Sequence, residues 1–129
     1  MTEIRSTNAA ALGAPAGHYS HAVCANGFVF VSGLLPIMPD GTKMTGQPFG
    51  EQVRQVLINL DEVLQACGTA SSHLVQVRAY ITDIGNWPAF DRVYGTWIGA
   101  ARPARCVVPV PELHYGLSLE IEAVAVLRT

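Results

Sequence analysis

The sequence predicts one α+β domain, residues 1–129, in which two helices cover a single face of a mixed β-sheet. Hydrophobic residues recur at every third or fourth position in two longer segments, as in helices, and five short segments are predicted as strands, one of them by strict alternation and others as nearly continuous apolar runs. These segments follow the order β-β-α-β-α-β-β, with no internal repeat or long linker between them. Helices on one face leave the other face open, so we expect a partner to cover it.

The first 48 residues predict two strands between irregular segments. Residues 1–17 are rich in Ala, Gly, Ser and Asn, and we expect an irregular arm there. Strands are expected over His18–Cys24 and Phe28–Ser32. The Asn26-Gly27 pair between them is typical of a hairpin turn, because both residues tolerate positive φ. The Pro- and Gly-containing stretch Leu34–Pro48 predicts an ordered surface loop.

The first helix is expected from Phe49 to Cys67, with Gly68 in a left-handed C-terminal cap. Its apolar residues form one stripe, and its opposite face carries polar residues that we expect to be solvated. These polar residues are Glu51, Arg54, Asn59 and Glu62.

The second half of the chain predicts a strand over Leu74–Ile81, a second helix, and two final strands over Ala104–Val110 and Leu117–Leu127. The second helix opens at Asn86-Trp87-Pro88, where we expect Asn86 to cap the helix with its side chain. The aromatic stripe of this helix is expected in the core. The inward-facing residues of the first of these strands are expected to be Val75, Val77, Ala79 and Ile81.

Composition excludes several classes of protein. Half of the residues are hydrophobic and 14% are charged, whereas about 25% are charged in a typical domain. The high hydrophobic content excludes a disordered chain. The low charged content suggests that another subunit covers part of the surface. The eight Lys and Arg residues are scattered and the net charge is −2, so we expect no nucleic-acid partner. No apolar run approaches 18 residues and no secretory signal opens the chain, so we expect no membrane partner and a cytoplasmic location. Three cysteines without C-x-x-C spacing are expected as reduced thiols: Cys24, Cys67 and Cys106, the last in the core.

Arg105 is the only charged residue in its expected strand, where it shares a face with Val107. A guanidinium stays charged at every accessible pH, so burying it requires an anionic partner. Three interpretations are open: an ion pair with a carboxylate of the same chain, a charge that reaches water at the strand end, or a bidentate clamp for a substrate carboxylate or phosphate. The clamp requires that no acidic side chain of the same chain already neutralises Arg105.

Glu120 and Glu122 share one face of the last expected strand with Val124 and Val126, which predicts a half-buried face. Apolar surroundings raise the pKa of a glutamate toward values useful to a general base. For Glu122 the alternative is an ion pair with a neighbour such as Arg78. We expect Arg105 and Glu120 to lie on adjacent strands. The four histidines show no metal-ligand spacing, and the chain lacks nucleotide-binding and serine-hydrolase motifs, so we expect no metal and no cofactor.

Several short segments resemble the RidA/YjgF family of imine and enamine deaminases, in the family's order and over essentially the whole chain. They are Gly17-His18-Tyr19-Ser20, Val31-Ser32-Gly33, Asn59-Leu60, Pro103-Ala104-Arg105 and Glu120-Ile121-Glu122-Ala123. The resemblance implies a chorismate-mutase-like fold assembled as a homotrimer, with the sheets lining a central barrel and three ligand sites between subunits.

The resemblance also implies residue roles. Arg105 would grip the carboxylate of a 2-imino or 2-enamino acid, Glu120 would hold the attacking water, and Tyr19, Ser32 and Gly33 would shape the pocket. Two further substrate-binding positions depart from the family's frequent residues, with Asp91 where many members carry Asn and Val107 where Cys is frequent. Leu34 stands where Gln is frequent.

The function expected from this resemblance is hydrolysis of 2-imino or 2-enamino acids, such as 2-iminopropanoate or 2-aminoacrylate, to 2-oxo acids and ammonia. One alternative is a non-catalytic trimer that binds a small carboxylate as a metabolite sensor. Another is an endoribonuclease, which the net charge of −2 disfavours.

Overall fold

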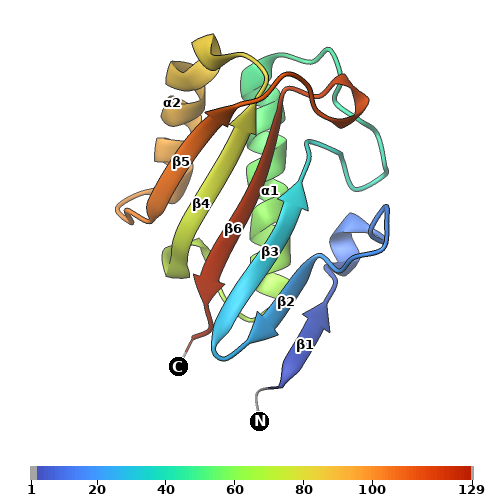
Figure 1. Ribbon diagram of the computed structural model, residues 1–129, viewed down its shortest axis with the longest axis vertical. Coiled ribbons are helices and arrows are strands. Elements are labelled where there is room, and N and C mark those ends of the chain that lie inside the picture. The colour runs from blue at the N-terminus through green and yellow to red at the C-terminus, as the bar shows by residue number, and fades with distance from the viewer. Residues whose placement is uncertain (1–2, 129) are drawn as a thin grey trace.

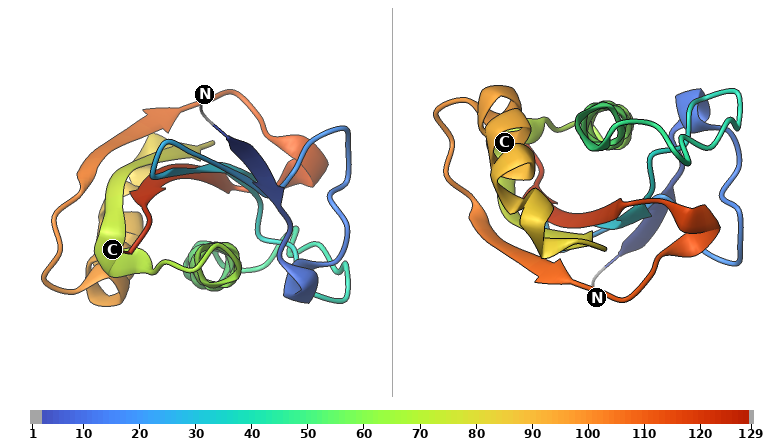
Figure 2. Two further views of the ribbon diagram at one scale, coloured as in Figure 1. Left: turned by 90° about the horizontal axis from the view of Figure 1, so that it is seen from below. Right: turned by 90° about the horizontal axis from the view of Figure 1, so that it is seen from above.

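The structure, a computed structural model, describes residues 3–128. Within them six strands form one sheet in the order β1-β2-β3-β6-β4-β5, and both helices pack on the same side of it (Figures 1 and 2). Neighbouring strands are antiparallel except β4 and β5, which are parallel. The expected α+β class is confirmed. The strands are β1 (Ile4–Thr7), β2 (Ala22–Ala25), β3 (Phe28–Leu34), β4 (Leu74–Ile81), β5 (Ala104–Pro109) and β6 (Leu119–Val126), and the helices are α1 (Phe49–Ala66) and α2 (Trp87–Ile98).

Strand β1 shows that an irregular arm over residues 1–17 was the wrong prediction. Residues 1 and 2 lie outside the described residues, but Ile4 to Thr7 pair with β2 as an edge strand. Most β1 side chains are exposed, so the strand lacks the apolar alternation that marks a half-buried strand. It forms because its backbone completes the hydrogen bonds of β2.

His21 holds the segment that precedes β2 in place through hydrogen bonds. The buried imidazole accepts a hydrogen bond at Nδ1 from the Ala9 N–H at 3.0 Å, and the His21 N–H donates to Asn8 Oδ1 at 2.9 Å. The Ser32 N–H donates to the His21 carbonyl at 3.0 Å. These contacts bend the chain, so β2 begins at Ala22 and not at the expected His18.

The predicted hairpin turn and the predicted cap at Gly68 are confirmed. Asn26 and Gly27 have φ of 54° and 83° and join β2 to β3 as a tight hairpin. Helix α1 ends one residue before Cys67, and Gly68 adopts φ 82° immediately beyond it.

Asn59 is buried at 4% exposure, so its expected place on the solvated face of α1 is wrong. Its Nδ2 donates to the Leu35 and Ile37 carbonyls at 3.1 and 3.0 Å, and its Oδ1 accepts from Gln55 at 2.9 Å. The loop after β3 folds back over α1, and Asn59 supplies the donors that its carbonyls need.

Two finer expectations in the second half also fail. Val75 is 43% exposed, because the register of β4 against β6 shifts between Leu74 and Gln76 and turns Val75 outward. Asn86 makes no side-chain cap on α2; instead Asp83 accepts the Gly85 N–H at 2.9 Å one turn earlier.

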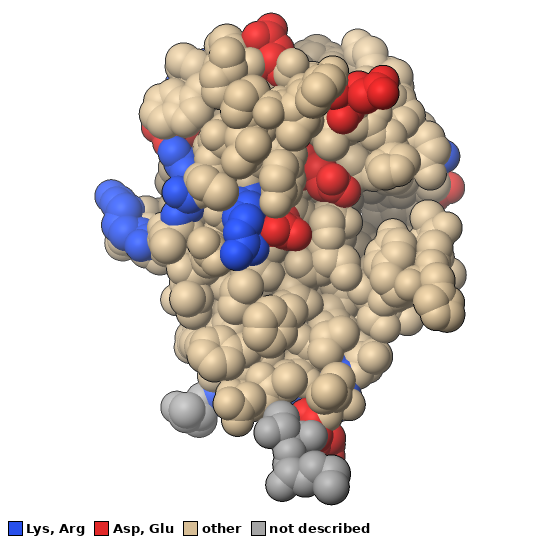
Figure 3. Space-filling model, in the orientation of Figure 1, with Lys and Arg blue, Asp and Glu red and all other residues tan. Residues whose placement is uncertain are grey.

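The core lies between the sheet and the helices, and the opposite face of the sheet is open. In β6 the odd-numbered residues from Leu119 to Ala125 are buried, and the even-numbered ones lie half-buried on the open face. Phe28 and Phe30 are 39% and 47% exposed there, and Figure 3 shows this face with few charged side chains. Cys106 is exposed, so the expected core thiol is wrong. In residues 3–128 no helix is both long and apolar enough to span a membrane.

The His21 contact predicts a pH-dependent stability. Burial lowers the pKa of His21 below its usual 6.5, so the unfolded chain binds a proton more readily than the folded one. The free energy of unfolding should therefore be highest above pH 6.5 and fall as the pH drops from there through the lowered pKa of His21. Urea unfolding of the wild type and of His21→Gln at a series of pH values measures the contribution of His21 to the free energy of unfolding. An equal change in the exposed-residue control His18→Gln would contradict the assignment.

Replacement of Asn59 should destabilise the fold. Asn59→Ala leaves two loop carbonyls without their donor, at a cost of about 2–4 kcal/mol in unfolding free energy. Chemical denaturation of Asn59→Ala beside Gln65→Ala, an exposed amide on the same helix, measures the difference. A loss no larger than that of Gln65→Ala would show that the loop does not depend on Asn59.

Candidate functional site

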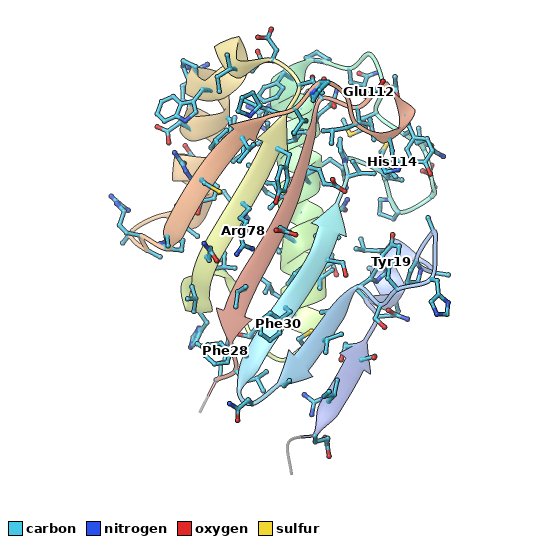
Figure 4. All side chains as sticks on the ribbon, in the orientation of Figure 1. Tyr19, Phe28, Phe30, Arg78, Glu112 and His114 are labelled. Carbon is cyan, nitrogen blue, oxygen red and sulfur yellow. The ribbon has the colours of Figure 1, made fainter. Side chains whose placement is uncertain are left out.

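A cleft of about 680 Å³ opens where β3 ends and β6 begins. It lies between the segment before β2, the loop after β3 and the turn before β6. Figure 4 shows Tyr19 and His114 at this end of the molecule, and Figure 3 shows the surface hollowed along the same edge. Its polar and aromatic lining comes from Tyr19, His21, Ser32, Lys43, Asn59, His114, Tyr115 and Glu120, with Gly33 at the backbone.

Glu120 lies directly against the backbone of Gly33. A Cβ on Gly33 would stand 2.7 Å from Glu120 Oε2 and 3.0 Å from its Cδ, closer than side chains approach. The backbone φ of Gly33 is not in the positive region, so space and not conformation requires glycine here. The absent side chain at Gly33 therefore leaves room for the Glu120 carboxylate.

Burial raises the pKa of Glu120 above its usual value. His114 nearby acts in the opposite direction, and the negative charge of Glu122 adds to the rise. A half-buried carboxylate of this kind is suited to accept a proton from water.

Ser32 and Tyr19 take different places in the cleft. The Ser32 hydroxyl donates to the Ser20 carbonyl at 2.6 Å, so it holds the segment that carries Tyr19. Tyr19 is 50% exposed and its ring lines the cleft. Ser32 therefore affects the cleft by holding in place the segment that carries Tyr19.

The turn before β6 forms part of the cleft wall. Tyr115 has φ 62°, an uncommon value for a bulky residue, and its carbonyl accepts from Thr45 Oγ1 at 2.7 Å. Lys43 Nζ lies 4.6 Å from the centre of the Tyr115 ring, a cation–π distance. Lys43 gave no signal in the sequence, because a lysine in a surface loop is ordinary.

Arg105 lies elsewhere, between β5 and α2. Its Nη1 donates to Asp91 Oδ1 at 2.9 Å. Its guanidinium carbon lies 5.7, 5.6 and 5.0 Å from the ring centres of Trp87, Phe90 and Tyr94. The rings and the carboxylate together fix the guanidinium. The expected core assignment of the aromatic stripe is confirmed for Phe90 and Tyr94, but Trp87 is 41% exposed beside Arg105.

Two expectations about Arg105 are wrong. A carboxylate of its own chain already contacts it, which is the first of the three interpretations that the sequence left open. Strand β4 separates β5 from β6, so Arg105 and Glu120 are not on adjacent strands. Arg105 faces α2, whereas Glu120 lies on the face away from the helices. Period-two alternation in β5 puts Val107, which packs against the core, on the same face as Arg105.

Glu122 has structural partners. Arg78 Nη1 donates to Glu122 Oε1 at 3.1 Å and Tyr80 Oη donates to the same oxygen at 3.0 Å. The predicted ion pair with Arg78 is confirmed, and Figure 4 shows Arg78 in the middle of the open face. Of the two glutamates on this face, Glu120 is the one that lines the cleft.

One chain thus presents two separate groups of candidate site residues. The first is the cleft with Tyr19, Ser32, Gly33 and Glu120, and the second is the cluster of Arg105, Asp91 and Val107 with the exposed Trp87 ring. Across residues 3–128 no three His, Cys, Asp or Glu side chains gather closely enough to hold a metal ion.

Comparison with known proteins gives consistent matches over the whole fold. Residues 8–127 match the family model described as Endoribonuclease L-PSP. A RutC family protein of Aquifex aeolicus is 38% identical over 128 residues, 98% of this chain and 99% of that protein. The chloroplastic Reactive Intermediate Deaminase A of Arabidopsis thaliana is 34% identical over 111 residues, 86% of this chain and 59% of that protein.

Solved structures show the same fold. The crystal structure of yeast Mmf1 has a TM-score of 0.93 at 30% identity and covers 98% of this chain and 100% of its own. RidA from an Antarctic Psychrobacter has a TM-score of 0.90 at 26% identity, with 95% and 99% covered. The family match, the relatives and the fold agree with the segments around Tyr19, Gly33, Arg105 and Glu120, and the chain belongs to the RidA/YjgF family, which includes a reactive intermediate deaminase.

Proposed function

We propose that this protein hydrolyses reactive 2-imino and 2-enamino acids, such as 2-iminopropanoate and 2-aminoacrylate. The enamine first takes up a proton at carbon to become the imine. Water then adds to the C=N carbon, and the carbinolamine loses ammonia to leave a 2-oxo acid. An imine carbon is already electrophilic, so the reaction needs an oriented water and an anchored substrate and no covalent nucleophile.

The observation that carries the proposal is the position of Glu120. Its carboxylate lies in a 680 Å³ cleft against the bare backbone of Gly33, with a pKa raised by burial. In this position it would accept a proton from water as that water attacks the imine. General-base assistance of this kind contributes about 10²–10⁴-fold to a rate.

The clamp expected from the sequence required an Arg105 without an acidic partner in its own chain, and that condition fails at Asp91. Arg105 would still anchor the substrate carboxylate, because Asp91 takes only part of its hydrogen-bonding capacity. Of the five N–H donors of a guanidinium, Asp91 receives one through Nη1. The remaining donors can still meet a carboxylate, while the rings of Trp87, Phe90 and Tyr94 keep the group in place. The pair with Asp91 lowers the net charge of the anchor, so we expect a weaker hold than that of a free arginine.

The complete site would form between chains of a homotrimer. Arg105 and Glu120 lie on opposite sides of the sheet in one chain, so a ligand that contacts both needs residues from two chains. The open sheet face with Phe28 and Phe30 supports an assembly in which three such faces line a central barrel. We also propose a cytoplasmic location, where the free and exposed thiol of Cys106 would stay reduced.

A non-catalytic trimer that binds a small carboxylate is the second candidate. The Asp91–Arg105 pair favours it, because an arginine held by its own chain can have a purely structural or binding role. A third candidate, RNA cleavage, is supported by names alone, among them the description of the family model, and the net charge of −2 disfavours it.

Replacement of the two proposed catalytic residues tests the deaminase. With 2-aminoacrylate generated in the assay by a lyase, Glu120→Gln should lose about 10²–10⁴-fold in kcat/KM because the amide cannot accept the proton. Arg105→Ala should lose about 100-fold because the carboxylate is no longer anchored. Arg92→Ala, an exposed arginine of α2, is the matched control.

The rate of ammonia release above the spontaneous rate is the readout, and the thermal stability of each variant shows that it is folded. Equal clearance by the wild type and both variants would remove this site from the reaction. Stabilisation of the wild type by a small carboxylate, lost in Arg105→Ala and without turnover of any imine, would favour the non-catalytic candidate.

Gly33→Ala should damage the reaction while leaving the fold intact. The new methyl group would stand 2.7 Å from Glu120 Oε2 and push the carboxylate out of position. We expect a loss of about tenfold or more in kcat with little change in melting temperature. Gly95→Ala, where a Cβ meets nothing within 4 Å, is the control. Unchanged kcat in Gly33→Ala would show that the position of Glu120 does not matter.

A further inference from the structure

Asp91 is the exposed member of its ion pair with Arg105. The side chain of Asp91 is 47% exposed and that of Arg105 is 20% exposed. The guanidinium lies within 6 Å of three aromatic ring centres, so it cannot swing outward without losing those contacts. A ligand that approaches this cluster therefore meets a carboxylate before it meets the guanidinium.

The contact leaves binding capacity on both groups. Only Nη1 of Arg105 and Oδ1 of Asp91 are joined, at 2.9 Å. The carboxylate has further lone pairs that can accept hydrogen bonds, and the guanidinium has further donors. The exposed Trp87 ring beside them adds an aromatic surface of the kind that cations favour.

We propose that Asp91 is a specificity-determining residue that selects substrates by the charge of their side chain. This inference rests on the proposed deaminase function and names its substrate class: 2-imino acids with a basic or hydrogen-bond-donating side chain are preferred, and those with an acidic side chain are rejected. A second carboxylate on the ligand is repelled by Asp91, whereas a guanidinium or ammonium group is attracted to it. The remaining donors of Arg105 would be taken by the 2-carboxylate that every such ligand carries, so the sign of the effect on the ligand's side chain follows from the charge of Asp91.

The test compares three imino acids generated in the assay by amino-acid oxidases from arginine, alanine and glutamate. Semicarbazide traps the imine, so the decrease in semicarbazone formation reports the enzyme's rate. We expect the kcat/KM of the wild type to be about tenfold or more higher for the arginine-derived imine than for the glutamate-derived one. Asp91→Asn keeps the shape and an acceptor oxygen for Arg105 but removes the charge, and should bring this ratio to within about threefold of one.

Glu62→Gln, which removes the same charge from α1, is the matched control. An unchanged substrate ratio in Asp91→Asn would overturn the proposal, as would an equal change in Glu62→Gln, since total charge would then explain the preference. A wild type that prefers the acidic imine would also overturn it.

A binding measurement separates this inference from the deaminase proposal. The stable products 2-oxo-5-guanidinopentanoate and 2-oxoglutarate can be titrated by calorimetry whether or not the protein turns over imines. A wild-type preference for the guanidino acid that Asp91→Asn abolishes would support the role of Asp91 even if no imine is cleared. Clearance of imines with no difference in binding or rate between the charge classes would leave the deaminase standing and reject the selection by Asp91.

Discussion

Strand β6 sits between β3 and β4, and its strict alternation governs both faces of the sheet. Leu119, Ile121, Ala123 and Ala125 point into the core beneath the helices, so the residues between them must point the other way. That alternation places Glu120 on the open face at the mouth of the cleft, and it places Glu122 beside Arg78. A shift of one residue in β6 would bury two glutamates and expose the core.

The same alternation in β5 directs Arg105 toward α2. Arg105 and Glu120, the two residues to which we assign chemical roles, therefore lie on opposite sides of one sheet, and one chain does not bring them together. In the homotrimer that we propose, the surfaces with the exposed Phe28 and Phe30 and with the exposed Trp87 near Arg105 would meet other chains. In that homotrimer, a single chain would supply only part of each site.

The sequence predicted best those features that depend on neighbouring residues. The limits of β4, the hairpin at Asn26-Gly27 and the cap at Gly68 follow from periodicity and backbone preference over a few positions. The predictions that were wrong concern residues whose partners lie far away in the sequence. Strand β1 exists because β2 offers it a backbone edge, and Asn59 is buried because a loop 22 to 24 residues away needs its donors.

The same distinction between local and distant contacts decides which parts of the candidate site could be predicted. Glu120 could be found because a glutamate between apolar residues of a strand is unusual at any position. The contact between Asp91 and Arg105 could be listed as one possibility but not chosen, since nothing in a helix sequence says which strand residue will face it. Likewise the need for Gly33 becomes visible only when Glu120 is seen against it.

The central place of β6 also bears on how the chain is made. Among the described strands β6 comes last in the chain, after both of its neighbours in the sheet. During synthesis one edge of β3 and one edge of β4 therefore remain unpaired until residues 119–126 leave the ribosome. The nascent protein consequently passes through a stage in which its largest strands can pair with other chains. Translation speed over the segment that encodes β6, and chaperones that cover strand edges, would then determine how much of the product folds correctly.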